Sequence, residues 1–267
     1  MIRVIFCGCF GRMGNVVRQL IRETGDVEIV AGVANKKTED NSGMKIVAGV
    51  DIIDGTAEFP VYRSINDVKE EADVIIDFSS PKALASLLGY ATSKNVPIVL
   101  CTTGFSEEQL ADIKEASEKV AILRSANMSL GINTLVKLLK TATEILAGNG
   151  YDIEIVERHH NQKKDAPSGT ALLLADAINK TADGRYEYVY DRSDRREVRP
   201  KNEIGISAVR GGSIVGDHEV IFAGLDEVIE ISHRAYSRNV FAKGAVSAAA
   251  FLAGKPAGMY DMGDVVG

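Results

Sequence analysis

The chain opens with the stretch Ile2-Arg3-Val4-Ile5-Phe6-Cys7-Gly8-Cys9-Phe10-Gly11-Arg12-Met13-Gly14, which decides the fold. Its apolar run at residues 2–7 predicts a buried strand. After the glycines, apolar residues recur with the i, i+3, i+4 spacing of an amphipathic helix, at Met13, Val16, Val17, Leu20 and Ile21. A strand, a glycine-rich turn and a helix together form the first unit of an alternating α/β architecture.

Strand and helix patterns continue to alternate through the first half of the chain. Helical spacing returns at residues 83–91, and Ser106 with Gln109 three positions later has the form of a capping box at a helix start. Short Val/Ile-rich runs predict strands at 27–33, 74–78, 98–102 and 121–124. Such alternation predicts a Rossmann-like, doubly wound parallel sheet with helices on both faces and right-handed crossovers.

The pattern changes near residue 128. Two helices are predicted at 130–147 and 170–180, with an alternating strand at 152–157 between them. Further strand patterns follow at 186–190, 204–209, 214–222 and 227–233, before an Ala-rich helix at 239–253. The last three strands succeed one another without helices. This part is therefore expected to be a second, α+β domain with a mixed, mainly antiparallel sheet.

Composition excludes several classes of protein. The 267 residues suffice for two domains, and a net charge of −6 without a long run of one sign argues against a nucleic-acid partner. No apolar stretch is long enough to span a membrane. The odd set of three cysteines, with no targeting segment ahead of the first strand, favours free thiols and a cytoplasmic location.

The glycine-rich turn is a candidate phosphate site. Glycines at the first βα turn let a pyrophosphate approach the backbone, and the following helix offers free N–H groups and the positive end of its dipole. The predicted contact residues are Gly8, Cys9, Phe10, Gly11, Arg12 and Met13. Phe10 stands where the second glycine of the common pattern would be, so a turn without any ligand remains an alternative.

The residues after the second predicted strand bear on the choice of cofactor. An acidic residue there would bind the ribose 2′-hydroxyl of NAD. Ala34-Asn35-Lys36-Lys37 carries no carboxylate, and Lys36, Lys37 and Arg12 are suited to a 2′-phosphate. The sequence therefore favours NADPH over NADH, with a solvated lysine pair on a surface loop as the alternative.

The segment from Glu157 to Thr170 carries the second group of candidate residues. His159, His160 and Lys163 lie in a cationic loop, and Ser168-Gly169-Thr170 opens the next helix, whose N–H groups can bind a carboxylate. Histidine is the usual general acid or base near neutral pH, and a lysine stabilises a bound or developing anion. The segment predicts acid–base chemistry on an anionic substrate.

Other chemistries fit the sequence less well. Adjacent histidines at a strand end diverge, and no cluster of Cys or carboxylates completes a metal site, so no metal is predicted. A serine hydrolase would need a G-x-S-x-G elbow, which is absent from the sequence. His218 and His233 have no motif around them and are interpreted as structural.

Taken together, these segments resemble the dihydrodipicolinate reductase family over nearly the whole chain. The most specific motif is Glu154-Ile-Val-Glu-Arg-His-His160, continued by Lys163, Asp165 and Pro167-Ser-Gly-Thr-Ala171. Further similar motifs are Gly11-Arg-Met-Gly14, Asp77-Phe-Ser79, Thr102-Thr-Gly-Phe105, Ala126-Asn-Met-Ser129, Val209-Arg-Gly-Gly212 and Asp261-Met262.

The resemblance implies roles for matching residues. His159 would be the general acid, assisted by Lys163, while hydride passes to substrate C4, the adjacent carbon is protonated and water is lost. By the same resemblance, the substrate's carboxylates would be bound by the residues that match the family's at His160, Lys163, Ser168, Gly169 and Thr170. The nicotinamide side would be lined by Cys101, Thr102, Thr103, Ser125, Ala126, Asn127 and Met128.

The resemblance also implies an architecture. Residues 1–128 plus 240–267 would form the dinucleotide-binding domain, and residues 129–239 the domain that binds substrate and joins subunits into a homotetramer. Two positions depart from the family pattern: Ala34 replaces an acidic ribose contact of some members, and Cys101 replaces a frequent glycine. The first weakens an NADH preference, and the second is expected to alter only packing.

Two other functions remain open from the residues. A different nicotinamide-dependent dehydrogenase, acting for example on an amino acid, would keep the glycine turn without needing the His-His-x-x-Lys and Ser-Gly-Thr pattern. A non-catalytic NAD(P)-binding sensor would bind the dinucleotide without turnover and leave His159 and Lys163 idle.

Overall fold

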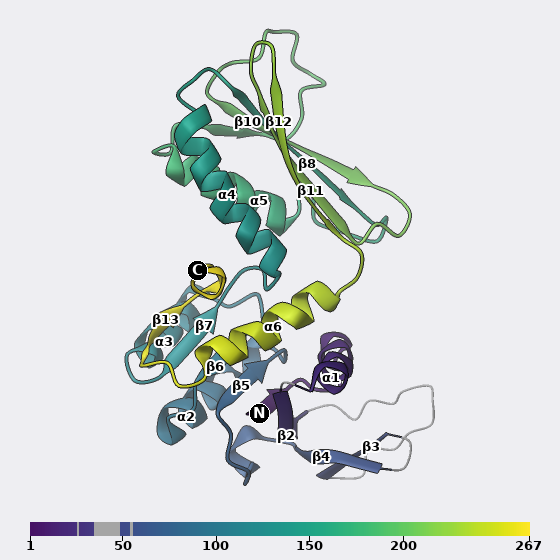
Figure 1. Cartoon of the computed structure of the whole chain (residues 1–267), viewed down its shortest axis with the longest axis vertical. Helices are drawn as coiled ribbons and strands as arrows, with labels where there is room; N and C mark the ends of the chain where they lie inside the picture. The colour runs from purple at the N-terminus through teal and green to yellow at the C-terminus, as the bar shows by residue number, and fades with distance from the viewer. Residues whose placement is uncertain (26, 35–48, 54–55) are drawn as a thin grey trace. The chain divides into compact units, whose positions relative to one another are not determined.

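The computed structural model describes residues 1–25, 27–34, 49–53 and 56–267, which form two compact units (Figure 1). Unit 1 comprises Met1–Ser129 and Phe241–Gly267, and unit 2 comprises Leu130–Val240. The C-terminal segment therefore folds with the N-terminal half. In these described ranges, no helix combines the length and apolar character needed to cross a bilayer.

Unit 1 is built on an eight-stranded sheet with the order β13-β7-β6-β5-β1-β2-β4-β3. Its described strand pairs are parallel except for β3 with β4. The strands are β1 (Ile2–Cys7), β2 (Val27–Val33), β3 (Gly49–Ile53), β4 (Thr56–Tyr62), β5 (Val74–Asp77), β6 (Ile98–Leu100), β7 (Ala121–Arg124) and β13 (Gly258–Tyr260). The predicted doubly wound sheet is confirmed, with β1 at the centre, where the strand order reverses.

The helices of unit 1 connect these strands. They are α1 (Arg12–Thr24), α2 (Leu84–Lys94), α3 (Glu107–Ser117), α6 (Asn239–Leu252) and α7 (Met262–Val266), with 3₁₀ turns at Ile65–Asp67 and Pro81–Ala83. The predicted capping box is confirmed, because Ser106 and Gln109 bond reciprocally at the start of α3. In α6, Gly244 lies against the Met128 carbonyl so closely that no Cβ would fit. This close approach fixes α6 beside the end of the N-terminal segment.

Unit 2 has a five-stranded sheet with the order β12-β11-β8-β10-β9. Its strands are β8 (Asp152–His159), β9 (Glu187–Val189), β10 (Glu203–Arg210), β11 (Gly216–Ala223) and β12 (Val228–Ala235). The expected mixed, mainly antiparallel sheet is confirmed: β11 pairs antiparallel with β8 and β12 along its length, while β8 and the short β9 pair parallel with β10. A long loop at residues 190–202 connects the parallel strands β9 and β10 without a helix.

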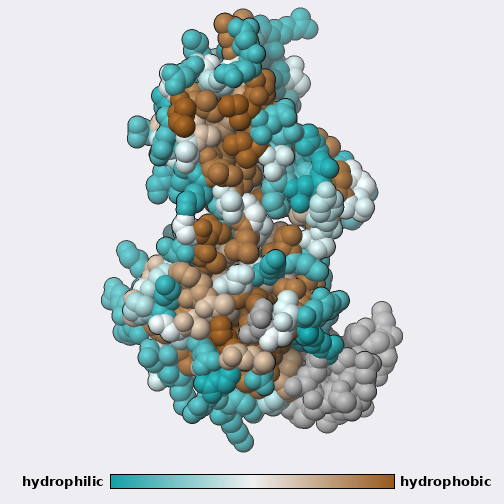
Figure 2. All heavy atoms as spheres, in the orientation of Figure 1, coloured by the Kyte–Doolittle hydropathy of each residue, from teal (hydrophilic) through white to brown (hydrophobic). Residues whose placement is uncertain are grey.

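The helices α4 (Leu130–Leu146) and α5 (Gly169–Thr181) lie side by side on one face of this sheet (Figure 1). Along β8 every second residue, from Ile153 to His159, is buried, as expected for a half-buried strand. Glu157 and His159 therefore share the buried face with the apolar core. Apolar side chains also gather over the outer side of α4 (Figure 2), where Leu138 and Ile145 are exposed. Scattered exposed apolar residues are normal and do not by themselves indicate a partner.

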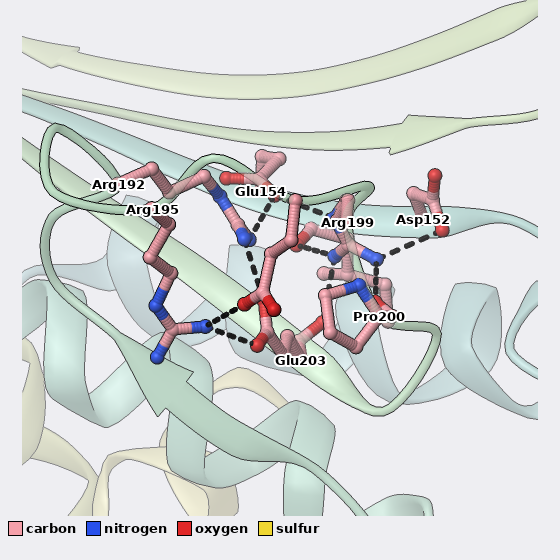
Figure 3. A network of polar contacts seen from close by, with 9 residues as sticks. Asp152, Glu154, Arg192, Arg195, Arg199, Pro200 and Glu203 are labelled. Atoms are coloured by element: carbon pink, nitrogen blue, oxygen red, sulfur yellow. Dashed lines mark hydrogen bonds and ion pairs between the residues drawn. The ribbon is translucent and has the colours of Figure 1, made fainter.

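Arginines of the 190–202 loop bind carboxylates of the sheet (Figure 3). Arg192 and Arg195 contact the buried Glu203 at 2.5 and 2.6 Å. Arg199 donates to Glu154 and Asp152 at 2.8 Å each, and to the carbonyls of Ile153 and Glu203. A parallel crossover usually contains a helix that packs on the sheet. Residues 190–202 contain none, and these hydrogen bonds hold the loop on the sheet instead.

We expect Arg199→Ala to loosen this loop. Hydrogen bonds to charged groups contribute about 1.5–3 kcal/mol each, and removing several should lower the free energy of unfolding by roughly 2–3 kcal/mol. Arg196→Ala is the matched control, because Arg196 of the same loop is exposed and should change stability by less than about 0.5 kcal/mol. Urea unfolding and limited proteolysis of both variants measure the difference. Equal stability of the two variants would contradict the proposed anchoring.

Candidate active site

The buried face of β8 places a carboxylate beside a histidine. Glu157 and His159 are two residues apart on the strand, so both side chains point to the helix-covered side. Their contact joins Glu157 Oε2 and His159 Nδ1 at 2.6 Å. Glu157 is fully buried and His159 is 8% exposed. The imidazole is therefore oriented by a carboxylate, as in many acid–base sites.

Arg210, from the end of the neighbouring strand β10, completes this arrangement. Its two terminal nitrogens contact the two oxygens of Glu157 at 2.7 Å each, in bidentate geometry. The Ser168 backbone N–H also donates to Glu157 Oε1 at 2.9 Å. Burial alone would raise the pKa of Glu157, but the bonds from Arg210, His159 and the Ser168 N–H outweigh it and lower this pKa below its usual value. Glu157 is therefore a carboxylate at neutral pH.

A second histidine of unit 2 supports the start of α5. Ser168 caps this helix by accepting from the Ala171 N–H at 3.1 Å, and its hydroxyl also lies 2.9 Å from His218 Nε2. His218, on β11, packs edge-on against His159 with ring centroids 5.1 Å apart. Burial, with the nearby positive charge of His159 next in size, lowers the pKa of His218 to about 3. His218 is therefore neutral under ordinary conditions.

The loop from His160 to Pro167 is tied to the same framework. Arg210 donates to the Asp165 carbonyl at 2.7 Å, and the Asn161 N–H donates to the Gly212 carbonyl at 3.3 Å. Lys163 forms an ion pair with Asp165 at 2.9 Å, which lowers the pKa of that carboxyl. The cationic loop is thus held by β10 and by the turn after it.

The glycine-rich turn of unit 1 has the geometry of a phosphate cradle. Gly8 has φ +80°, and a Cβ there would lie 2.5 Å from the Phe78 carbonyl oxygen. Gly14 packs so tightly on the carbonyls of Gly8 and Cys9 that a side chain is excluded. Gly11 caps α1 without any side-chain bond, which leaves the first N–H groups of the helix for an anion. The residues present fit a dinucleotide pyrophosphate.

Other candidate residues of unit 1 cluster at the carboxyl ends of β5 and β6. The Cys101 N–H donates to the Asp77 carbonyl, and Ser79 donates its hydroxyl and its N–H to the buried Asp77 carboxylate. Burial raises the pKa of Asp77 and, far more strongly, that of the Cys101 thiol. The Cys101 thiol is therefore neutral, and its effect on packing beside a nicotinamide stays a prediction.

The loop after β7 forms a compact turn in the same unit. The Ser125 hydroxyl donates to the Asn127 carbonyl at 3.1 Å, and Asn127 Oδ1 accepts from the Ser129 N–H at 2.8 Å. Asn127 and Met128 are buried in this turn. Among the described residues of both units, no group of three or more His, Cys, Asp or Glu side chains is arranged to bind a metal ion.

Comparison with known proteins decides the family. Two family models match, described as "Dihydrodipicolinate reductase, N-terminus" over residues 2–128 and "Dihydrodipicolinate reductase, C-terminus" over residues 131–266. The chain belongs to the dihydrodipicolinate reductase family. The resemblance seen in the sequence is thereby confirmed.

Relatives in this family match over their full length. The 4-hydroxy-tetrahydrodipicolinate reductase of Caldanaerobacter subterraneus is 52% identical, covering 100% of this chain and 98% of the relative. That of Clostridium tetani is 50% identical over 98% and 96%. Among solved structures, the dipicolinate-bound dihydrodipicolinate reductase of a Paenisporosarcina species has a TM-score of 0.80 at 24% identity, covering 98% of this chain and 97% of that one, which shows the shared fold.

The structure places some of the predicted site residues in one hydrogen-bonded network and adds two further residues to it. In unit 2, His159 and Ser168 join one hydrogen-bonded network, and Lys163 lies in the loop that this network anchors. In unit 1, the predicted cofactor residues lie at the turns after β1, β6 and β7, apart from Lys36 and Lys37, which lie outside the described residues. Sequence reasoning missed the roles of Arg210 and His218, both brought to β8 by sheet pairing. The spacing of Glu157 and His159, two apart on a strand, could have suggested their contact.

Replacing Ser168 tests the link between the helix cap and His218. Ser168→Ala removes an N-cap, worth about 1 kcal/mol, and leaves the buried His218 Nε2 unpaired, so we expect unfolding to become easier by roughly 2–3 kcal/mol. Ser106→Ala removes the exposed cap of α3 and should cost only about 1 kcal/mol. Urea unfolding of both variants compares the two losses. A loss from Ser168→Ala no larger than that from Ser106→Ala would contradict the link.

Proposed function

We propose that this chain catalyses the NAD(P)H-dependent reduction of 4-hydroxy-tetrahydrodipicolinate to tetrahydrodipicolinate in lysine and diaminopimelate biosynthesis. Membership of the reductase family across both units supports this assignment. The observation that carries it is the buried His159, oriented by Glu157 and adjoining the cationic loop with Lys163. A protein that only senses the dinucleotide would have no need of this arrangement.

The glycine-rich turn would hold the dinucleotide. Residues Gly8 to Met13 and the uncapped start of α1 would bind the pyrophosphate. The nicotinamide side would be lined by Cys101, Thr102, Thr103 and the turn from Ser125 to Met128. A reduced nicotinamide bound there supplies a hydride for substrate C4.

His159 would act as general acid. It donates a proton to the carbon next to C4, and Lys163 stabilises negative charge on the substrate as that proton arrives. Its ion pair with Asp165 places the Lys163 ammonium in the loop after β8. The hydroxyl of the substrate leaves as water together with a hydrogen of that adjacent carbon, so the overall change is a reduction together with a dehydration.

The substrate side is suited to a small dicarboxylate. His160, Lys163, Gly169 and Thr170 would bind its carboxylates, at the N-terminal end of α5, where the helix dipole favours an anion. Ser168 contributes as the cap of α5, because its hydroxyl is buried against Ala171 and His218. The related protein from Paenisporosarcina is described as binding dipicolinate, which is a dicarboxylate of this type.

We propose NADPH as the preferred donor. The residue after β2 is Ala34, so no carboxylate there would repel a 2′-phosphate. Arg12, exposed at the start of α1, supplies a positive charge near the turn. A homotetramer and a cytoplasmic location remain predictions from the family resemblance and the free cysteines, and light scattering of the purified protein tests the first.

A coupled assay tests the proposed function. Pyruvate and aspartate semialdehyde, with the upstream synthase, generate the substrate while absorbance follows NADPH and NADH in parallel. We expect oxidation that requires the synthase, and faster oxidation of NADPH. Folded protein that binds both dinucleotides but oxidises neither would contradict the reductase function and favour the sensor.

A further inference from the structure

The hydrogen-bonding capacity of Glu157 determines where the proton of His159 lies. Each carboxylate oxygen has two partners: Oε1 accepts from Arg210 and from the Ser168 N–H, and Oε2 faces Arg210 and His159 Nδ1. An ionised carboxylate only accepts hydrogen bonds, and both Arg210 and the backbone N–H only donate. The hydrogen between Oε2 and Nδ1 therefore belongs to the imidazole.

We propose that Glu157 is a positioning residue for the reductase reaction: it fixes His159 in the Nδ1–H tautomer and leaves Nε2 to exchange the proton with the substrate. The inference rests on the proposed function and adds to it the atom that carries the proton. In a neutral imidazole one nitrogen donates and the other accepts, so fixing Nδ1 fixes the role of Nε2.

The surroundings of His159 agree with this role. A Cβ at Gly216, on β11, would lie 3.1 Å from His159 Nε2, so glycine at this position leaves space beside that nitrogen. The buried Nδ1 side of the ring, by contrast, is filled by Glu157. The Nδ1 side of the ring is thus occupied by Glu157, whereas Gly216 keeps the Nε2 side free of a Cβ atom.

Of the charged groups around the His159 imidazole, Glu157 is the carboxylate that contacts it. From β10, Arg210 contacts Glu157 rather than the ring, and from β11, His218 is neutral. From the following loop, Lys163 is paired with Asp165. When His159 is protonated, Glu157 is therefore the group that stabilises the imidazolium directly.

Nitrogen NMR of the wild-type protein tests the tautomer without any substitution. The chain has four histidines, so labelling them with ¹⁵N gives few ring signals, and His159→Gln identifies those of His159. At alkaline pH we expect the neutral ring of His159 to show a protonated Nδ1 and an unprotonated Nε2. A protonated Nε2 in the neutral ring would overturn the proposal.

Kinetics of Glu157→Gln test the consequence for turnover. Loss of the carboxylate should lower kcat at neutral pH about 10- to 100-fold, because the ring is no longer held in the Nδ1–H tautomer. In the His159→Gln background the same substitution should change kcat less than about threefold, since residues that act as a unit are not additive.

Glu203→Gln is the matched control, because Glu203 is also buried in unit 2 and bound by two arginines but belongs to the 190–202 loop network. It should lower stability and leave kcat within about threefold of the wild type. An unchanged kcat for Glu157→Gln, or equal losses in both backgrounds, would overturn the positioning role. If Glu157→Gln does not fold, the wild-type tautomer decides. Absence of synthase-dependent turnover in the wild type would overturn the proposed function instead, while the tautomer could still be measured.

Discussion

His159→Gln should lower kcat for synthase-generated substrate by about 10²–10⁴-fold, the usual contribution of general acid catalysis. Glutamine keeps a polar group of similar size near Glu157 but cannot deliver a proton. The dissociation constant for NADPH should change less than about threefold, because the predicted dinucleotide residues belong to unit 1 and His159 to unit 2. Stopped-flow turnover and fluorescence titration of NADPH measure the two effects.

His233→Gln provides the control for this substitution. His233 lies on β12 in the same unit, half-buried and outside the hydrogen bonds of Glu157. Its replacement should leave kcat within about threefold, since it removes no group of the proposed acid site. A His159→Gln variant that also retained kcat within threefold would show that His159 is not the proton donor.

Gly14→Ala should disrupt binding of the dinucleotide. The added methyl group would collide with the carbonyl oxygens of Gly8 and Cys9, so the turn and α1 must move apart. Overpacking of this kind typically costs about 1–3 kcal/mol, and if this cost falls on dinucleotide binding the KM for NADPH should rise roughly 5- to 150-fold. Steady-state kinetics with varied NADPH and thermal unfolding measure both consequences.

Gly89→Ala is the matched control in the same unit. Gly89 lies on α2 with no atom within 4 Å of its Cβ position, and alanine should stabilise the helix by up to about 1 kcal/mol. Its KM for NADPH should remain that of the wild type. An unchanged KM for Gly14→Ala would contradict the role of the glycine turn as a phosphate cradle.

Most of the fold could be predicted because its elements carry periodic patterns. β1 and β2 were predicted with their observed bounds, and the helix expected at 239–253 is α6 within one residue. β4 and β13 were not predicted, since Pro60 interrupts the first and the second has only three residues. Local sequence also gave no sign that β9 and β10 pair in parallel, because that pairing depends on the arginine-bound loop between them.

The candidate site could be predicted only where its residues are neighbours in the sequence. His159, Lys163 and the cap at Ser168 fall within one segment, and their types and spacing indicated acid–base chemistry. Arg210 and His218 are about fifty residues away, at 53 and 50 positions from their partners Glu157 and Ser168. Only the pairing of β10 and β11 with β8 brings them to the site, and single residues without a motif carry no local sign of that pairing.

Transfer of labelled hydride tests the central claim most directly. The wild-type protein would be given synthase-generated substrate and NADPH that carries deuterium at the transferable position of C4, and the product would be analysed by mass spectrometry. The account predicts tetrahydrodipicolinate that contains one deuterium, at C4. Oxidation of the cofactor without deuterium in this product, or no product at all, would contradict the claim that this chain reduces that substrate.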